Sequence, residues 1–417
     1  MAKNKTKASP KKVIAIIIAV ILVLGVLTTS IALIVRNKDK VITVDGKVKH
    51  TIIGFTGMTD ESGELKWTGD IAKYNKDDPY EEEESGTYVR VTSKLDDVFP
   101  YNSIIEVQDK NGNEFVGFPK MYMSYVKNGF GYIDGVNFAN YKVDDSYFIS
   151  DAWLNPDGSG NYVEYFYIGK YEASGSAEKI FSKVGETPLV SITREGFRTA
   201  ARSYGTAKNY YNGYQQLDIA MYTVYAFLTS CYYRTDNIET IYSGDTDMEQ
   251  ADSTGTTDGC HSLNGWNTST HAVKMLGVEN IYGSVSEFCE GIYFEKDRVF
   301  YISNPTKFSD TEGGLNIGFA RPTNTGYVEY LKSGTSAYTQ SAIYPAVVGN
   351  DSSKFEGDYC TYSDNGVILR IGGDFGDEDK AGIYCFSGNS SVSQTIDVSG
   401  GRLCGRNLKD VTRMNVA

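Results

Sequence analysis

A run rich in glycine, serine and aspartate near the carboxyl end constrains this chain more than any other stretch. The run extends from Arg370 to Arg402, and small residues recur at its start, middle and end. Such residues let backbones approach closely or adopt positive φ, so their recurrence favours a rigid frame over a solvated loop. The positions that we expect to build this frame are Gly372, Gly373, Ala381, Gly382, Gly401 and Arg402.

Between the small residues stand side chains of varied chemistry, which predict a contact surface carried by the frame. Aromatic rings supply contact area at low entropic cost, and aspartate and serine supply adaptable hydrogen bonds. Tyr384 and Phe386 share one face of a strand, so the alternative is that these two are core residues. The predicted ligand-binding residues are Asp374, Phe375, Asp377, Asp379, Tyr384, Phe386, Ser393 and Asp397.

The spacing of these residues resembles the C-terminal segment of the variable proteins of diversity-generating retroelements. It is also similar to the formylglycine-generating-enzyme-like domains, also known as sulfatase-modifying-factor-like domains. That pattern is Arg-x-Gly-Gly-x-aromatic, then Ala-Gly-x-aromatic, then a polar stretch ending in Gly-x-Arg. It falls here on Arg370, Gly372, Gly373, Phe375, Ala381, Gly382, Tyr384, Gly400 and Arg402.

Further segments carry the same resemblance in the same order: Phe99–Tyr122, Asn161–Ser174 and Leu276–Phe288. Helices are expected from Thr193, which is a suitable N-cap, to Gly205, and over 215–232, where apolar residues recur at helical spacing. Residues 304–341 are expected to form a long loop. The resemblance implies an α+β C-type lectin fold over residues 87–405, with a small twisted antiparallel sheet, two helices and long loops.

An uncharged apolar stretch at 13–35 sets the expected organisation of the rest. As a helix it is about 35 Å long, enough to cross a bilayer. The lysines before it favour a cytoplasmic N-terminus, and a cleavable signal peptide, the alternative, would normally end in a small-x-small site. We therefore expect a single-pass signal anchor at the cell membrane with an extracellular C-terminal domain. The remaining segments are a basic tail at 1–12, a small β stalk at 36–86 and a C-terminal tail at 406–417.

Charge and cysteine content restrict the partners and cofactors. The net charge is −13 although the first forty residues are basic, and an acidic ectodomain argues against nucleic acid. No Cys-x-x-Cys occurs among the six cysteines, which disfavours zinc, while disulfides remain open. Calcium also remains open, because a solvated loop is the alternative for the acidic residues Asp245, Asp247, Glu249, Asp252 and Asp258. We expect no cofactor.

The sequence favours a binding protein over an enzyme. The resemblance would imply catalysis only with a close cysteine pair near the carboxyl end, and Cys385 and Cys404 are well separated. We expect a membrane-anchored, surface-displayed protein whose variable region at about 370–402 binds a protein or glycan on another cell, phage or host surface. Retroelement mutagenesis would diversify that region. The alternatives are a formylglycine-generating-enzyme-like oxidoreductase and a static structural or adhesive protein of the envelope or of a prophage.

Overall fold

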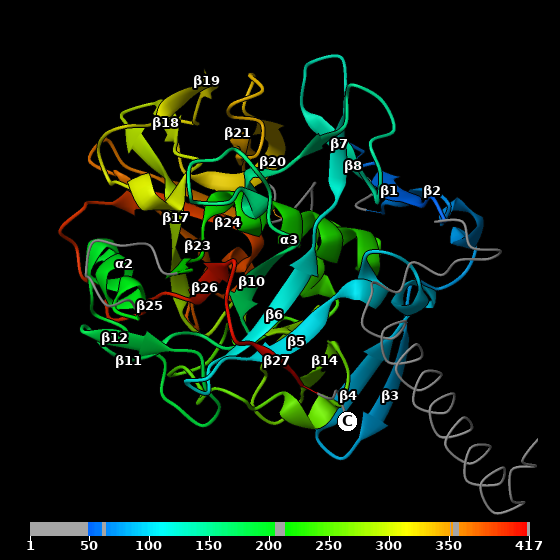
Figure 1. Cartoon of the computed structure of the whole chain (residues 1–417), viewed down its shortest axis with the longest axis horizontal. Coiled ribbons are helices and arrows are strands. Elements are labelled where there is room, and N and C mark those ends of the chain that lie inside the picture. Colours follow the sequence, from blue (N-terminus) through cyan, green and yellow to red (C-terminus); the bar gives the residue numbers. More distant parts are fainter. Residues whose placement is uncertain (1–48, 61–63, 205–212, 351, 353–357, 415–417) are drawn as a thin grey trace, which may run out of the picture. The chain divides into compact units, whose positions relative to one another are not determined.

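The computed structural model describes residues 49–60, 64–204, 213–350, 352 and 358–414. The described residues from His50 onwards form one compact unit. The unit is mostly β, with two α-helices among the described residues, α2 (Arg194–Arg202) and α3 (Ile219–Tyr233) (Figure 1).

The largest sheet has nine strands and carries the C-terminal run. Strand β25 (Ser399–Gly400) pairs in parallel with β17, outside the main order. The other strands, in spatial order, are β19 (Leu315–Ala320), β18 (Arg298–Tyr301), β17 (Ser286–Glu295), β23 (Ile368–Gly372), β24 (Gly382–Ser390), β22 (Tyr359–Tyr362), β20 (Gly326–Ser333) and β21 (Ile343–Gly349).

Two further large sheets pack in the same unit. The six-stranded sheet has the order β13 (Tyr214–Gln216), β26 (Leu403–Arg406), β10 (Tyr165–Gly169), β6 (Glu114–Pro119), β5 (Ile105–Gln108) and β27 (Thr412–Arg413). A five-stranded sheet has the order β2 (Lys66–Gly69), β1 (Ile52–Thr56), β8 (Ile133–Ala139), β7 (Tyr122–Lys127) and β9 (Phe148–Ile149).

Two smaller groups of strands complete the described β-structure. One is a second five-stranded sheet, of order β16 (Val278–Glu279), β15 (Val273–Met275), β14 (Asn264–Asn267), β4 (Tyr88–Thr92) and β3 (Glu81–Ser85). The other is the pair of β11 (Ser174–Ser176) and β12 (Lys179–Phe181).

Helix α3 lies at the centre of the core (Figure 1). All fifteen of its residues are buried, and the Asp218 carboxylate caps its first turn by accepting from the N–H groups of Ala220 and Met221. The Tyr222 hydroxyl donates to the Ile383 carbonyl of β24, while the Tyr225 ring packs on Phe118 of β6. The helix thus joins two sheets, which is why its apolar residues surround it rather than form one stripe.

Both predicted helices are confirmed. Thr193 caps α2 by accepting from the Gly196 N–H at 3.1 Å. The second predicted helix, at 215–232, begins four residues later than expected because Tyr214–Gln216 pairs as β13 with β26.

The predicted α+β C-type lectin fold is wrong. The structure has a nine-stranded sheet and several smaller ones in place of a single small sheet with long loops. Residues 304–341, expected as a loop, contain the whole of β19 and β20. Short strands formed between segments distant in sequence, such as β1 with β8, account for the difference. Local hydrophobic patterns do not reveal such partners.

The ends of the unit contribute strands. Strands β1 to β3 come from residues expected to form a stalk, and β27 comes from the expected C-terminal tail. In the part of the chain that the structure describes, no helix combines the length and apolar character needed to cross a membrane. The predicted span at 13–35 lies outside the described residues. The expected single-pass anchor, with its extracellular domain, is therefore not supported.

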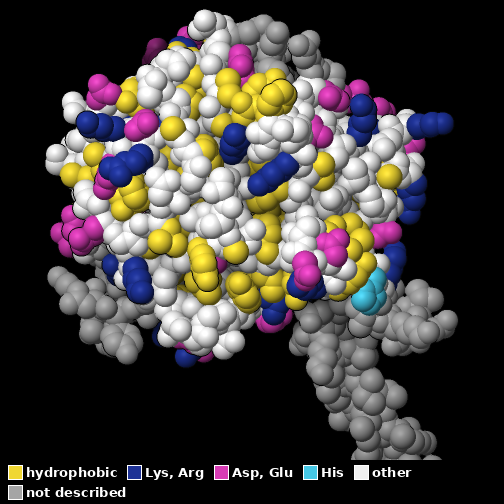
Figure 2. All heavy atoms as spheres, turned by 90° about the horizontal axis from the view of Figure 1, so that it is seen from above, with side chains coloured by type: hydrophobic (Ala, Val, Ile, Leu, Met, Phe, Trp, Pro, Cys, Tyr) yellow, Lys and Arg dark blue, Asp and Glu magenta, His cyan; other side chains and the backbone are white. Residues whose placement is uncertain are grey.

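The surface mixes acidic, basic and apolar side chains, as the face in Figure 2 shows. Phe130 and Tyr338 are the most exposed large apolar side chains among the described residues, at 77% and 75%. Isolated apolar side chains on a surface are normal, so they do not mark a site by themselves.

Candidate functional site

Strands β23 and β24 form the frame that the C-terminal run predicts. They pair antiparallel, with Gly372 opposite Gly382. Gly372 and Gly373 have φ of 86° and 75°, and a Cβ on Gly372 would lie 2.6 Å from the Ile281 carbonyl oxygen. A Cβ on Gly382 would clash with the Asp358 carboxylate. Only glycine fits these positions without moving the backbone, so they fix where the connecting loop leaves the sheet.

Arg402 ties the end of the run to the rest of the unit. Its side chain is fully buried and ion-paired with Glu287 of β17. The same guanidinium donates to the Gly169 and Glu279 carbonyls at 3.1 and 2.9 Å. Burial raises the pKa of the Glu287 carboxyl, and Arg402 opposes that rise. Gly401 packs beside this contact, where a Cβ would lie 3.0 Å from the Gln216 side-chain oxygen.

Buried polar side chains hold the neighbouring turns in place. The Glu279 carboxylate accepts from the N–H groups of Gly255 and Thr257 at 2.6 and 2.9 Å. The Asn280 side chain accepts from the Val273 N–H at 3.0 Å. These side chains thus satisfy N–H groups of buried loop backbone.

Two of the predicted ligand-binding residues lie in the core. Tyr384 and Phe386 are completely buried in β24. The Tyr384 hydroxyl shares a hydrogen bond of 2.9 Å with the Ser230 hydroxyl of α3, and the Phe386 ring packs 5.5 Å from that of Tyr344. They cannot contact a ligand, and the alternative that they are core strand residues is correct.

The other predicted residues lie on two loops that flank the frame. Asp374, Phe375 and Asp377 are half-buried, whereas Asp379, Ser393 and Asp397 are exposed. The first loop joins β23 to β24, and the second follows β24. Electrostatic coupling of Asp374 with both Asp377 and Asp397 places the loops close together. We call loops 374–380 and 391–398 the loop surface.

Of the acidic groups of the loop surface, Asp374 has a shifted pKa. Burial, with a further contribution from the Asp377 carboxylate, raises the pKa of Asp374 to about 6. Arg370 of β23 lies among them: it donates to the Ser286 and Ser399 hydroxyls at 2.9 and 2.8 Å, and burial lowers its pKa. The Arg370 guanidinium thus lies within electrostatic reach of the Asp374 and Asp377 carboxylates.

Backbone hydrogen bonds hold the first loop in place. The Phe375 N–H donates to the Ser284 carbonyl at 3.0 Å, and the Phe375 carbonyl accepts from the Met248 N–H at 2.8 Å. The Glu378 N–H donates to the Thr246 carbonyl at 2.8 Å. Within the loop, the Asp377 carboxylate accepts from the Asp374 N–H at 3.0 Å and the Asp374 carboxylate from the Gly376 N–H at 3.1 Å, so the loop has a fixed backbone.

Sequence reasoning missed two residues of this surface. Glu378 is exposed at the tip of the first loop with a φ of 51°, and Tyr327 of β20 donates its hydroxyl to Asp379 at 3.0 Å. Tyr327 belongs to residues 304–341, which were expected to form a long loop, so no sequence pattern placed it beside Asp379. Glu378 lies between the predicted binding residues Asp377 and Asp379, and this position could have identified it as part of the same surface.

The loop surface offers charge, hydrogen bonding and one aromatic ring. All six cysteines are buried, and burial raises the pKa of the Cys385 and Cys404 thiols, so neither is set up as a nucleophile. Among the residues that the structure describes, no group of three or more His, Cys, Asp or Glu side chains is placed to hold a metal ion. This chemistry suits recognition.

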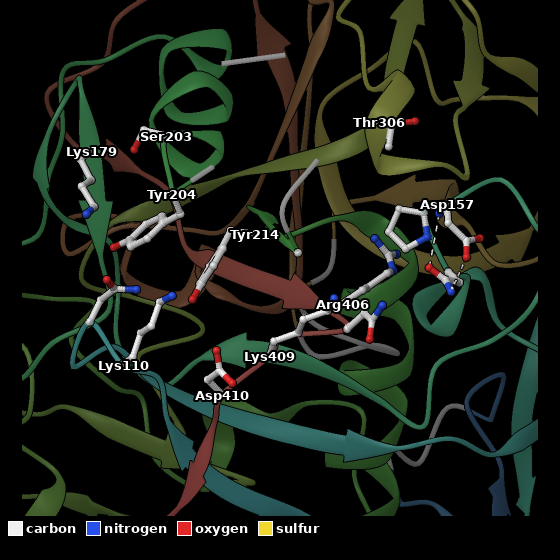
Figure 3. A pocket seen from close by; sticks show the side chains of 15 residues that line it. Lys110, Asp157, Lys179, Ser203, Tyr204, Tyr214, Thr306, Arg406, Lys409 and Asp410 are labelled. Atoms are coloured by element: carbon white, nitrogen blue, oxygen red, sulfur yellow. Dashed lines mark hydrogen bonds between the residues drawn. The ribbon is translucent and has the colours of Figure 1, made fainter. Parts of the chain in front are cut away.

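A cavity of about 740 Å³ lies apart from the loop surface. Tyr204 and Tyr214 stack there at 4.4 Å, and the Lys179 ammonium lies over the Tyr204 ring. Tyr204 and Gly213 border residues 205–212, which are outside the described range. No predicted ligand-binding residue lines it, so we do not assign it to the site. Its lining consists of Lys110, Asn111, Asn155, Pro156, Asp157, Lys179, Ser203, Tyr204, Gly213, Tyr214, Thr306, Arg406, Asn407, Lys409 and Asp410 (Figure 3).

Comparison with known proteins gives a weak likeness to a solved structure. No protein-family model matches the chain, and no curated protein matches it. Among solved structures it is similar to Treponema denticola variable protein 1, at 14% identity and a TM-score of 0.28. The match covers 72% of this chain and 98% of that one. A likeness of this size does not establish a shared fold or function.

Proposed function

We propose that this chain is a ligand-binding protein and that the loop surface makes the contacts. The observation that carries the proposal is the contrast within one short run. The frame contains the buried residues Gly372, Gly373, Ala381, Gly382, Gly401 and Arg402. The loops beside it expose several side chains. A rigid scaffold that presents exposed loops is the usual arrangement for recognition.

The charge of the loop surface selects the kind of partner. The loop surface carries Asp374, Asp377, Asp379 and Asp397, and the nearby Arg370 guanidinium is already hydrogen-bonded to serine hydroxyls. These carboxylates favour a partner that presents cationic or hydrogen-bond-donating groups, and Phe375 adds apolar contact area. The partner would be a protein or a glycan.

A pair of charge-matched variants of the full chain tests this surface. One replaces Asp374, Asp377, Asp379 and Asp397 with alanine. The control replaces the four exposed glutamates of β3, residues 81–84, with alanine. Hen lysozyme, immobilised, serves as a cationic probe. The loop variant is expected to bind it at least about tenfold more weakly than the parent, a loss of about 1.4 kcal/mol in binding free energy. The β3 variant is expected to lose less than about twofold in affinity.

Thermal melting must accompany the binding measurement. Both variants are expected to melt within a few degrees of the parent, because surface substitutions change stability little. Equal losses of binding in the two variants would show a general charge effect. Unchanged capture by the folded loop variant would remove the loop surface from the proposal.

We further propose that retroelement mutagenesis diversifies residues 370–402, as the sequence resemblance implies. The neighbouring DNA tests this. A reverse-transcriptase gene, with a second copy of these codons that differs at adenines, is the expected finding. Without both, the chain is a static binder.

A further inference from the structure

The acidic loop before β14 contains one carboxylate in an unusual position. The structure separates the five residues named for this loop. Asp247 and Glu249 are exposed, and Asp258 forms a 3.0 Å salt bridge with Lys170. Asp245 and Asp252 remain.

Asp245 is completely buried without a compensating charge. Its exposed fraction is 0%, and neither carboxylate oxygen has a hydrogen-bond partner among the described residues. The Asp252 N–H approaches this carboxylate without completing a hydrogen bond. No described lysine or arginine is within salt-bridge distance of Asp245. Burying a carboxylate in this way is costly unless a proton or a cation neutralises it.

A second carboxylate faces the first. Burial and the neighbouring Asp252 carboxylate together raise the pKa of Asp245 to about 7. One Asp252 oxygen is also buried without a partner among the described residues. Thr270, which precedes His271, has a buried hydroxyl oxygen without a partner among the described residues. Several unsatisfied oxygens thus come from adjoining segments.

The backbone holds Asp245 where it is. Its carbonyl accepts from the Ser284 N–H at 2.6 Å, and a Cβ on Gly283 would lie 2.5 Å from that oxygen. Gly244 and Gly283 have φ of 77° and 72°, which glycine adopts without strain. The main chain is therefore fixed at the position that carries the buried carboxylate.

We propose that Asp245 and Asp252 bind a divalent cation, preferentially Ca²⁺. Calcium accepts carboxylate, hydroxyl, carbonyl and water oxygens in flexible geometry. Mg²⁺ demands a tighter octahedron, and zinc prefers nitrogen or sulfur ligands. With two carboxylates, the expected Kd is on the order of 10⁻⁴–10⁻³ M. The Thr270 hydroxyl, carbonyls and water would complete the coordination.

Equilibrium dialysis of the EDTA-treated full chain against radioactive calcium tests the site. One Ca²⁺ should bind per chain, and 10 mM CaCl₂ should raise the Tm by roughly 3 °C or more, with a smaller rise in MgCl₂. Asp245→Asn and Asp252→Asn should each abolish binding and the Tm shift. The double variant Asp247→Asn/Glu249→Gln, with exposed acids of the same loop, should retain both.

Three outcomes would overturn the proposal. They are the absence of bound calcium in the parent chain, undiminished binding by both single variants, and binding of Mg²⁺ as tight as that of Ca²⁺. Melting in EDTA checks that each variant folds. Since asparagine has the size of aspartate without its charge, Asp245→Asn should fold, and Asp252→Asn decides the question if it does not. The cation site stands or falls independently of the loop surface.

Discussion

Strand β24 and the loop before it contain similar side chains and have opposite environments. Phe386 in the strand is completely buried, whereas Phe375 in the loop is half-exposed. Tyr384 is hydrogen-bonded inside the core, while Tyr327 meets Asp379 at the surface. Residue type alone therefore does not distinguish frame from surface here. The environment follows from whether the backbone pairs within the sheet or leaves it.

The two phenylalanines give the largest expected difference. Phe386→Ala should lower the free energy of unfolding by about 3–5 kcal/mol, because it empties a packed site. Phe375→Ala should cost less than about 1 kcal/mol. Urea denaturation of both variants measures the difference. Comparable losses in the two would mean that the loop is as much a part of the core as the strand.

The two tyrosines sharpen the comparison at a smaller scale. Tyr384→Phe leaves the buried Ser230 hydroxyl without this partner, and it should cost about 1–3 kcal/mol. Tyr327→Phe loses only an exposed hydrogen bond and should cost within about 0.5 kcal/mol. Chemical denaturation at neutral pH tests both. If removing the Tyr327 hydroxyl costs more, the loop depends on side-chain contacts and is not a free surface.

The smallest expected effect is the pH dependence of stability that comes from the titration of Asp374. Its pKa in the folded chain is about 6, above the ordinary value of 3.8, because burial and Asp377 disfavour the charged form. The folded state therefore holds this proton more tightly than the unfolded state, so stability falls as pH rises from about 4 to about 6. Asp374→Asn should remove this fall, worth about 1 kcal/mol after allowance for solvent screening.

Urea denaturation at pH 4 and pH 7 measures this effect. Ser393→Ala, which lies on the same surface and does not titrate, should keep the parent's pH dependence. An Asp374→Asn chain with the parent's pH dependence would show that this carboxyl is solvated like any exposed acid.

The sequence predicted local structure better than architecture. The Thr193 cap and the helical spacing over 215–232 depend on neighbours in sequence, and the structure shows both. The fold class failed because the sheets form between distant segments. Strand β17 pairs with β23, and β20 pairs with β21 and β22, across loops of no distinctive pattern.

The candidate site was predictable in part for the same reason. Glycine spacing identified the frame, because Gly372 and Gly373 need positive φ whatever surrounds them. It did not separate Tyr384 from Asp374, since β24 is buried on both faces and its alternation carries no information. The proposed cation site at Asp245 depends on contact with a turn at Gly283, which lies later in the chain. The sequence around Asp245 therefore does not reveal it.

The main-chain bonds of the first loop restrict which sequences it can accept. The N–H groups of Phe375 and Glu378 are both donors to other segments, and proline has none to give. Proline is thus the residue that these two positions should reject, while the remaining amino acids leave the donors intact. The set of sequences that this loop can accept would therefore be limited by the need for backbone N–H donors rather than by side-chain chemistry.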